Sequence, residues 1–350
     1  LIKCLNLGEN MKKAVIAMSG GVDSSVAALL MKNEGYTCVG ATMQLYSEGD
    51  CSDAKAVADK LGMPFYIFPL KEEFKKQVID KFIEFYENGK TPNPCVECNR
   101  TLKFGAMMDK MHELDGDFVV TGHYARVVFE NGEYKLKKAV DETKDQSYFL
   151  YMLTQEQLKH IKFPLGEYTK PEIRQIAEEN DLITARKKDS QDICFVPDGD
   201  YVSFIKSYNN KEYPKGQFIH KDGFSFGEHK GIVNYTIGQR KGLGIAYKNP
   251  LYVLNIDPET NNVILGDNED LFTDTVVAEN VNIISGKTIT EPIRVLARVR
   301  YRHKEQPATA WQDENGNLHV KFDEPQRAIT KGQSLVIFDG DEVLGGGEII

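Results

Sequence analysis

Long apolar runs are missing from this sequence. No stretch approaches the ~20 apolar residues that a membrane-spanning helix needs, and the mean hydropathy of −0.40 is that of a globular chain. We therefore expect no membrane partner and a cytoplasmic protein. The first ten residues, LIKCLNLGEN, contain one lysine and no apolar core. They do not resemble a secretory signal, and we interpret them as an extension ahead of Met11.

Cysteine is also scarce, since only six occur among 350 residues. In a chain of this size without a secretion signal, so few thiols argue against a disulfide framework and for a reducing compartment. Clustered cysteines there serve catalysis or metal binding. Taken singly, Cys4, Cys38 and Cys51 are more simply explained as small buried residues. The candidates for chemistry are Cys95, Cys98 and Cys194.

An overall excess of positive charge is missing too. The net charge is −9 and the pI is near 5.4. The negative net charge excludes a general electrostatic attraction of the whole molecule to nucleic acid, but it does not exclude a local basic patch.

Apolar periodicity predicts an α/β domain over residues 11–208. Short β-branched runs alternate with helical patterns, which indicates a parallel sheet covered on both faces, with the ligand at the carboxyl ends of the strands. We expect strands at 12–18, 36–43, 64–70 and 117–129, a hairpin arm at 133–140, and helices at 22–33, 53–62, 72–88, 154–160 and 170–180.

The composition changes after about Tyr208. Glycine and proline become frequent and helical periodicity disappears, which predicts a small β-rich middle domain over 209–272. From 273 to 350 only strand patterns follow, typical of a compact antiparallel β-barrel or sandwich.

The segment Ser19–Ser25 reads SGGVDSS between an expected strand and an expected helix. Backbone N–H groups and the positive end of a helix can hold a phosphate there, and two glycines allow close approach. A glycine-rich turn alone is often a mere connection, and no Gly-Lys-Ser follows as in a Walker loop. The full SGGVDSS resembles the PP-loop of enzymes that cleave ATP between its α- and β-phosphates. Asp23 is a candidate Mg²⁺ ligand, or else a favourable charge at the helix start.

Cys95 and Cys98 form a CxxC in TPNPCVECNR, and Cys194 follows the basic stretch ARKKDSQ. We expect the CxxC on a turn, where two sulfurs can reach one metal or each other, and where a distant third thiol can join them. A structural zinc needs four ligands, and the flanks offer neither a fourth cysteine nor a close histidine. Positive charge near Cys194 would lower the pKa of that thiol and favour the reactive thiolate.

Five motifs occur in one order: SGGVDSS, PNPxxxCNRxLKFG (92–105), TGHYA (121–125), KDQSYFL (144–150) and DSQDICF (189–195). Together they resemble the tRNA-specific 2-thiouridylases. The resemblance extends over nearly the whole chain from Met11. Enzymes of that family use ATP to activate the C2 oxygen of the wobble uridine in certain tRNAs, and then replace it with sulfur. The resemblance therefore implies ATP and Mg²⁺ as cofactors, tRNA as a partner, and a sulfur donor that is a cysteine desulfurase or a sulfur-relay protein.

The resemblance also implies roles for single residues. Cys98 would be the nucleophile, and Cys194 would receive the sulfur as a persulfide, so that a Cys98–Cys194 disulfide remains after transfer. The target base would meet Asn93, Pro94 and Cys95. Expected ATP contacts are Ala17, Met18, Ser19, Gly20, Gly21, Val22, Asp23, Ser24, Ser25, Met43 and Gly122. Expected tRNA contacts are His123, Lys144, Asp145, Gln146, Tyr301, Arg302 and Gln333.

One position departs from the family pattern. Many members carry aspartate where this sequence has Cys95, and a thiol does not replace a carboxylate cleanly in acid–base work. Cys95, Cys98 and Cys194 could instead bind three irons of a [4Fe–4S] cluster whose fourth iron holds a sulfide. Cluster-assisted delivery and the persulfide route both use Cys98 and Cys194, and both stay open.

Arg298, Arg300 and Arg302 alternate in ARVRYRHK. On one strand they would share a face and could line up with RNA phosphates, or they could protect an exposed strand edge by their charge. Arg186, Lys187 and Lys188 near Cys194, with Arg100 and Lys103 near Cys98, favour RNA, and we expect binding that weakens steeply with salt. His123 taken alone would more often be a polar core residue, but within TGHYA we expect a tRNA contact.

Two other functions are compatible with parts of this pattern. A PP-loop enzyme that amidates a substrate or forms lysidine would not need Cys98 and Cys194. A zinc- or redox-responsive RNA-binding protein would leave SGGVDSS unexplained. Formation of AMP and pyrophosphate only in the presence of tRNA would separate the thiolation reaction from the binding protein.

Overall fold

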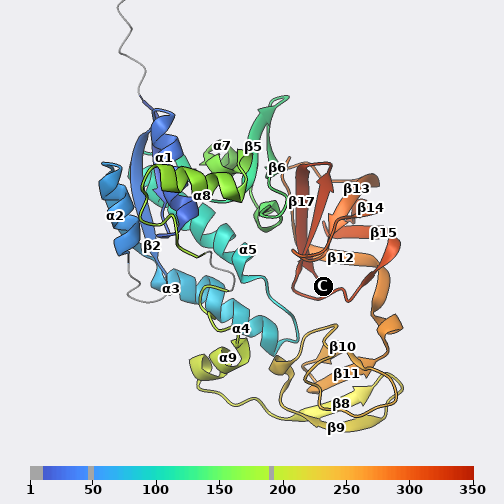
Figure 1. Ribbon diagram of the computed structural model, residues 1–350. Helices are drawn as coiled ribbons and strands as arrows, with labels where there is room; N and C mark the ends of the chain where they lie inside the picture. The colour runs from blue at the N-terminus through green and yellow to red at the C-terminus, as the bar shows by residue number, and fades with distance from the viewer. Residues whose placement is uncertain (1–10, 46–50, 189–192) are drawn as a thin grey trace, which may run out of the picture. The chain divides into compact units, whose positions relative to one another are not determined.

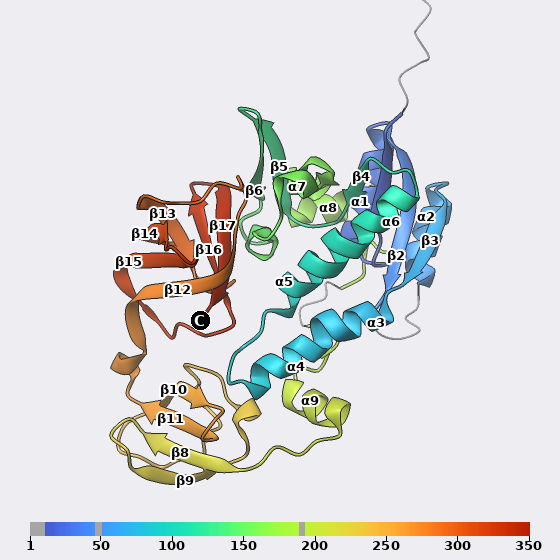
Figure 2. The same cartoon turned by 180° about the vertical axis from the view of Figure 1, so that it is seen from behind.

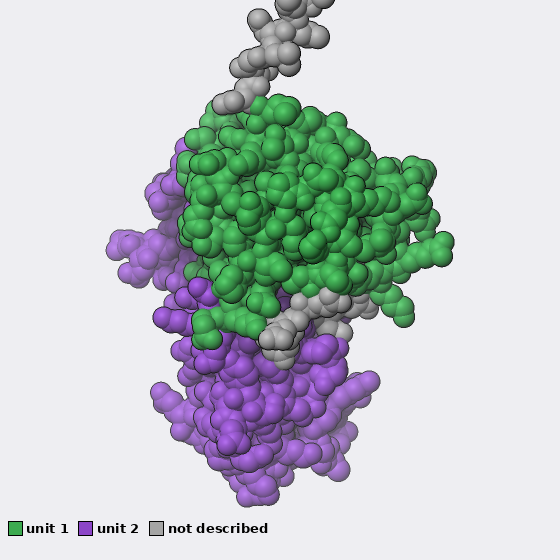
Figure 3. All heavy atoms as spheres, turned by 90° about the vertical axis from the view of Figure 1, so that its left-hand side faces the viewer, with its two compact units in different colours: residues 1–72, 99–147, 155–189 green, residues 73–98, 148–154, 190–350 purple. Residues whose placement is uncertain are grey.

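The computed structural model describes residues 11–45, 51–188 and 193–350. The chain divides into two compact units, coloured separately in Figure 3. Unit 1 comprises residues 1–72, 99–147 and 155–189, and unit 2 comprises residues 73–98, 148–154 and 190–350. Within the described ranges, no helix is both long and apolar enough to cross a membrane. The expected domain limits at 208/209 and 272/273 stay a prediction.

Unit 1 is built on a parallel five-stranded sheet with the order β3-β2-β1-β4-β7. β1 lies in the middle, and its Ala14 pairs with Cys38 of β2 on one side and with Phe118 of β4 on the other. The carboxyl end of β1 is therefore flanked by two strands that end on the same side. The strands are β1 (Lys13–Ala17), β2 (Thr37–Gln44), β3 (Phe65–Pro69), β4 (Phe118–Val120) and β7 (Ile161–Lys162).

Helices cover both faces of this sheet, as the sequence predicts (Figures 1 and 2). Side chains of a strand point alternately to opposite faces. Ala14 and Ile16 of β1 therefore belong to a core shared with α1 (Val22–Asn33), α2 (Ser52–Lys60) and α8 (Lys170–Glu179). Val15 points to the other face, where it borders Gly116 together with Met111 of α6 (Met107–Glu113).

The stretch 117–129 differs from the single strand that the sequence predicts. It contains β4 in the parallel sheet and then β5 (Ala125–Glu130), which forms an antiparallel hairpin with β6 (Glu133–Lys138). Asn131 and Gly132 turn this hairpin with φ of 54° and 85°, the positive values that a tight two-residue turn requires. TGHYA lies at the junction between the two strands. The helix α7 (Gln155–Lys159) lies close to its predicted position.

Unit 2 begins with helices. α3 (Lys71–Phe74) starts in unit 1 and continues through a π-helical turn, η1 (Lys75–Ile79), into α4 (Asp80–Glu87). α5 (Pro94–Cys98) follows, and α9 (Tyr201–Asn209) packs on α4 through an aromatic stack between Tyr86 and Tyr201, with ring centroids 4.5 Å apart.

Two β-structures complete unit 2, and both confirm the predicted fold class. A small four-stranded sheet has the order β10-β11-β8-β9. The six strands of the C-terminal barrel follow the order β12-β15-β14-β13-β16-β17, and pairing between β12 and β17 closes it. The strands are β8 (Gly216–His220), β9 (Ser225–His229), β10 (Tyr252–Asp257), β11 (Asn262–Gly266), β12 (Phe272–Ile283), β13 (Ile293–Arg298), β14 (Gln306–Gln312), β15 (Leu318–Arg327), β16 (Ser334–Asp339) and β17 (Glu342–Ile349).

Two local predictions are wrong. The CxxC does not lie on a turn, because Cys95 and Cys98 both belong to α5, which leads into a π-helical stretch, η2 (Asn99–Ala106), ahead of α6. The expected row of arginines on one strand does not form either, because β13 ends at Arg298 and the chain then turns.

Candidate active site

The SGGVDSS loop follows the carboxyl end of β1 and runs into the first turn of α1. Gly20 has a φ of +72°, which favours glycine at this turn. Ser24 Oγ accepts from the backbone N–H of Ser19 at 3.2 Å, and Ser25 Oγ donates to the carbonyl of Gly21 at 2.8 Å. The loop is thus tied to the start of a 12-residue helix, the arrangement that binds phosphate.

Strand β2 fixes the end of β1 just before the loop. The N–H of Met18 donates to the carbonyl of Ala41 at 2.8 Å, and Thr42 Oγ1 donates to the carbonyl of Met18 at 2.6 Å. Met43, an expected ATP contact, is half-buried next to Thr42, and Ala17 is half-buried at the end of β1. The structure therefore brings the expected ATP residues of β1 and β2 to one edge of the sheet.

Gly122 lies directly against this loop. A Cβ atom added there would lie 2.9 Å from the carbonyl carbon of Asp23 and 2.9 Å from the nitrogen of Ser24. These atoms belong to the backbone, so they cannot yield as a flexible side chain can. The expected ATP residue Gly122 thus meets the loop just after the end of β4, and only a glycine allows this approach.

Asp23 is held by two side chains that the sequence does not point to. Lys170 Nζ donates to Oδ1 and Oδ2 of Asp23 at 2.7 and 2.8 Å, and the hydroxyl of Tyr124 donates to Oδ1 at 2.7 Å. Three hydrogen-bond donors thus already meet this carboxylate, and its role as a Mg²⁺ ligand stays a prediction. No spacing in the sequence connects the start of α8 with the loop; only the fold does.

A second lysine, Lys187, is hydrogen-bonded to the loop. Lys187 Nζ donates to the carbonyl of Gly20 at 3.0 Å and to Oδ2 of Asp53 at 2.7 Å. The sequence predicts this lysine as part of a basic surround for Cys194, but the described partners of its side chain lie at the loop and on α2.

The thiols proposed for chemistry lie in unit 2. On α5, Cys98 is buried and Cys95 is exposed, and Cys194 is exposed ahead of Phe195. Residues 189–192 of the DSQDICF motif lie outside the described residues, as does Cys4. Phe195 is inserted among the rings of Phe74, Phe82 and Phe204, with centroid distances of 5.7, 5.2 and 5.3 Å.

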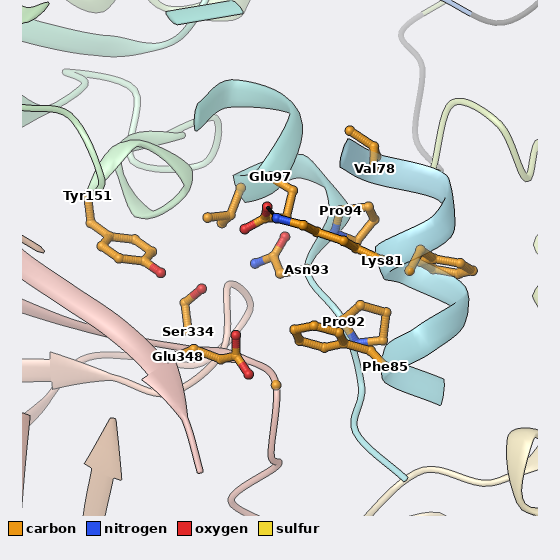
Figure 4. A pocket seen from close by; sticks show the side chains of 13 residues that line it. Val78, Lys81, Phe85, Pro92, Asn93, Pro94, Glu97, Tyr151, Ser334 and Glu348 are labelled. Atoms are coloured by element: carbon orange, nitrogen blue, oxygen red, sulfur yellow. Dashed lines mark hydrogen bonds and ion pairs between the residues drawn. The ribbon is translucent and has the colours of Figure 1, made fainter. Parts of the chain in front are cut away.

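α5 also borders a pocket of unit 2, shown in Figure 4. Asn93 and Pro94, two of the three expected target-base contacts, line it, and Cys95 does not. Opposite them lie barrel side chains, including Ser334 and Glu348. The sequence gives no signal for these two residues, because they are distant from the motifs.

Models of three domain families match the chain in sequence order. They are a tRNA methyl transferase HUP domain over residues 12–198, a tRNA methyl transferase PRC-barrel domain over 202–267, and an aminomethyltransferase β-barrel domain over 273–349. Proteins named tRNA-specific 2-thiouridylase MnmA are similar over the whole length. Those from Clostridioides difficile and Clostridium acetobutylicum are both 49% identical, covering 97% of this chain and 98% and 99% of those proteins. The chain belongs to the tRNA-specific 2-thiouridylase family.

Three of the expected tRNA contacts form hydrogen bonds within unit 1. Asp145 is buried and accepts from the N–H of Ala139 and from the N–H and Oγ of Ser147, at 3.1, 3.2 and 2.9 Å. Gln146 Oε1 accepts from the N–H of Tyr124 at 3.0 Å. Lys144 is half-buried, and its N–H donates to the carbonyl of Asp141. Their tRNA contacts stay a prediction.

His123 is buried in the same 2-thiouridylase motif, TGHYA. Its Nδ1 lies 2.6 Å from Thr121 Oγ1, and its Nε2 lies 3.5 Å from Lys103 Nζ. Burial, and then the charge of Lys103, lower the pKa of His123 well below its usual 6.5, so the ring is neutral at pH 7. This placement suits a core histidine, and a tRNA contact would have to come from a residue that is only 7% exposed.

The barrel places the other expected contacts differently. Tyr301 packs on Phe149 at a centroid distance of 4.4 Å, and Arg302 is exposed. Arg298 forms an ion pair with Glu305 at 2.7 Å, while Arg300 donates to Thr330 Oγ1 at 2.6 Å. Two of the three arginines predicted to meet phosphate therefore have structural partners.

The iron–sulfur alternative finds no support in the arrangement of the thiols. Among the residues that the structure describes, no three His, Cys, Asp or Glu side chains lie close enough to hold a metal ion. The described arrangement therefore does not confirm a cluster held by Cys95, Cys98 and Cys194, and the cluster stays a prediction.

Proposed function

We propose that this protein replaces the C2 oxygen of the wobble uridine of tRNA with sulfur, using ATP, in the cytoplasm. Family membership over 97% of the chain carries this proposal. The phosphate-binding geometry of the SGGVDSS loop and the two thiols of unit 2 are the features that the reaction needs.

The first step is the activation of a poor leaving group. The C2 oxygen attacks the α-phosphorus of ATP, pyrophosphate leaves, and the uridine oxygen becomes part of an AMP ester. The N–H groups at the start of α1 would hold the phosphates, with Lys170 close by. Mg²⁺ would arrive with the phosphates and neutralise part of their charge.

The second step transfers sulfur. A donor protein, a cysteine desulfurase or a sulfur-relay protein, leaves a persulfide on Cys194, whose exposed position suits such an exchange. The terminal sulfur bonds to C2 and AMP leaves. The thiolate of Cys98 then attacks Sγ of Cys194, which breaks the bond to the transferred sulfur, and the electron pair leaves with that sulfur as 2-thiouridine. The products are 2-thiouridine and a Cys98–Cys194 disulfide, which a thiol reductant opens by supplying two electrons.

The test is mass spectrometry of tRNA nucleosides after incubation with ATP, a sulfur source and the wild type, Cys98→Ala or Cys194→Ala. We expect 2-thiouridine only with the wild type, and AMP and pyrophosphate only when tRNA is present. Cys38→Ala is a matched control, because Cys38 is a buried thiol of the unit 1 core. Normal 2-thiouridine formation by either active-site variant would refute the role given to that cysteine.

The sulfur source is tested separately by anaerobic purification with iron and sulfide analysis. An iron-free protein that thiolates tRNA at full rate supports the persulfide route. Activity that depends on bound iron would instead support the cluster of Cys95, Cys98 and Cys194.

A further inference from the structure

A loop of the barrel is hydrogen-bonded to the segment that leads into the Cys98 helix. Residues 328–333 connect β15 to β16, and residues 90–93 precede α5; both segments belong to unit 2. The N–H of Thr91 donates to the carbonyl of Lys331 at 2.8 Å. The side-chain amide of Gln333 donates to the carbonyls of Thr91 and Pro92 at 3.0 and 3.1 Å.

The same two segments pack without space for another side chain. Gly332 is buried with a φ of +85°, and an added Cβ would lie 2.9 Å from Phe85 Cδ1 and 3.0 Å from the carbonyl oxygen of Thr91. Beside this contact, Lys90 Nζ forms an ion pair with Glu348 of β17 at 2.8 Å. Glycine at position 332 therefore allows the barrel backbone to approach the 90–93 segment.

The 328–333 loop is itself fixed to the barrel. Arg300 donates to the hydroxyl of Thr330 at 2.6 Å and also to the carbonyl of Ala328. Thr330 is buried. These hydrogen bonds hold the loop that carries Gly332 and Gln333 in place on the barrel.

On the other side, the contacted segment determines where α5 begins. The carbonyl of Asn93, the residue after Pro92, accepts from the N–H groups of Val96 and Glu97 at 3.1 and 3.4 Å. These bonds form the first turn of the helix that ends at Cys98. A shift of Thr91 and Pro92 would therefore move the start of α5 and, with it, the thiol of Cys98.

We propose that Gln333 and Gly332 are positioning residues for Cys98, through which the C-terminal barrel determines where the nucleophile lies. The importance of this positioning for catalysis rests on the proposed function of Cys98. The contact also gives Gln333 a role that requires no tRNA, whereas the family resemblance implies only a tRNA contact.

The test measures how fast iodoacetamide alkylates Cys98 in the full chain without ATP or tRNA, by mass spectrometry of peptides. Cys98 is only 9% exposed, so its alkylation depends on local opening. We expect Gln333→Ala to raise the rate about fivefold to thirtyfold, the effect of losing one or two hydrogen bonds. Gln333→Met, which fills the same space without a donor, should raise it similarly, and Gln333→Glu should raise it more, because a carboxylate would face two carbonyl oxygens. Gly332→Ala should act in the same direction.

Controls are available in the same chain. Gln312→Ala also removes a barrel glutamine whose amide donates to a backbone carbonyl, that of Gly316 at 3.0 Å, and it should leave Cys98 unchanged. Cys38 in unit 1 serves as an internal reference in every sample.

Three results would overturn the proposal. Gln333→Ala could leave the Cys98 rate unchanged, or it could raise the Cys38 rate equally, which would indicate global loosening. The third is a wild-type Cys98 rate in Gln333→Met and Gln333→Glu, which would show that the side chain only fills space. The measurement needs no thiolation, so a protein that opens Cys98 but forms no 2-thiouridine would refute the proposed function alone.

Discussion

Lys170 Nζ contacts both carboxylate oxygens of Asp23, at 2.7 and 2.8 Å, beside the phosphate-binding loop. The Lys170 side chain is 9% exposed and that of Asp23 is 32% exposed, so the pair is largely shielded from water. The lysine neutralises Asp23 at a place where the proposed ligand carries several negative charges.

The first prediction concerns this pair. Lys170→Met should destabilise the protein by about 2 kcal/mol, because it leaves a half-buried carboxylate without its cation. It should also weaken ATP binding, since a positive charge near the phosphates is lost. The double variant Lys170→Met/Asp23→Asn should be more stable than Lys170→Met, as measured by urea unfolding. Additive destabilisation in this double-mutant cycle would show that the two side chains are not coupled.

The second prediction concerns Phe195, which follows Cys194. Phe195→Ala should lower the free energy of unfolding by about 3 kcal/mol, because Phe195 is 1% exposed and packs among three phenylalanines. It should also slow the formation of the Cys98–Cys194 disulfide under a mild oxidant, measured by mass spectrometry. Phe218→Ala, a buried ring of the middle sheet, is the matched control and should lower stability without slowing the disulfide. Equal slowing in both variants would argue against a local role.

The third prediction concerns His123 and pH. The pKa of His123 is lowered in the folded protein, so between that value and about 6.5 the unfolded chain binds more protons than the folded one. The contribution of His123 to the free energy of unfolding is therefore fully present above about pH 7. It is lost as the pH drops below 6.5, by at most about 1.4 kcal/mol per pH unit. His123→Asn should lose less stability between pH 7 and 5 than the wild type, whereas the exposed His112→Asn should follow the wild type. Identical curves for His123→Asn and the wild type would contradict the buried neutral ring.

The fourth prediction concerns the RNA surface of the barrel. Arg302→Ala should weaken tRNA binding and lower the slope of log K against log salt by about 1, because an exposed phosphate contact is lost. Arg294→Ala is the control, since this exposed arginine already pairs with Asp323 at 2.6 Å. Binding measured by filter retention at several salt concentrations distinguishes them. A slope that does not change with Arg302→Ala would remove this residue from the RNA surface.

Much of the α/β domain could be predicted because its strands are short β-branched runs and its helices end at glycine. Gly35 and Gly62 follow α1 and α2 with φ of 89° and 64°, as a left-handed helix end requires. The helical stretch from 94 to 113 could not be predicted as easily. It starts between prolines and contains the π-helical turn η2, which shifts the apolar spacing, so only Pro94 at its first position indicates a helix.

The site could be predicted where a motif is contiguous in sequence and not where the fold assembles it. SGGVDSS and the glycine of TGHYA meet as the motifs indicate. Lys170 and Tyr124 reach Asp23 from segments 147 and 101 residues away, and no spacing rule connects them. The arginine row is wrong because alternation predicts a shared face only within one strand, and here the strand ends at Arg298.

The close approach of Gly122 to Asp23 and Ser24 has a genetic consequence. A methyl group at position 122 would lie 2.9 Å from backbone atoms of Asp23 and Ser24. A substitution at a neighbouring position changes a side chain and does not remove backbone atoms. Loss of this glycine should therefore yield no second-site suppressors among the surrounding side chains, only true revertants.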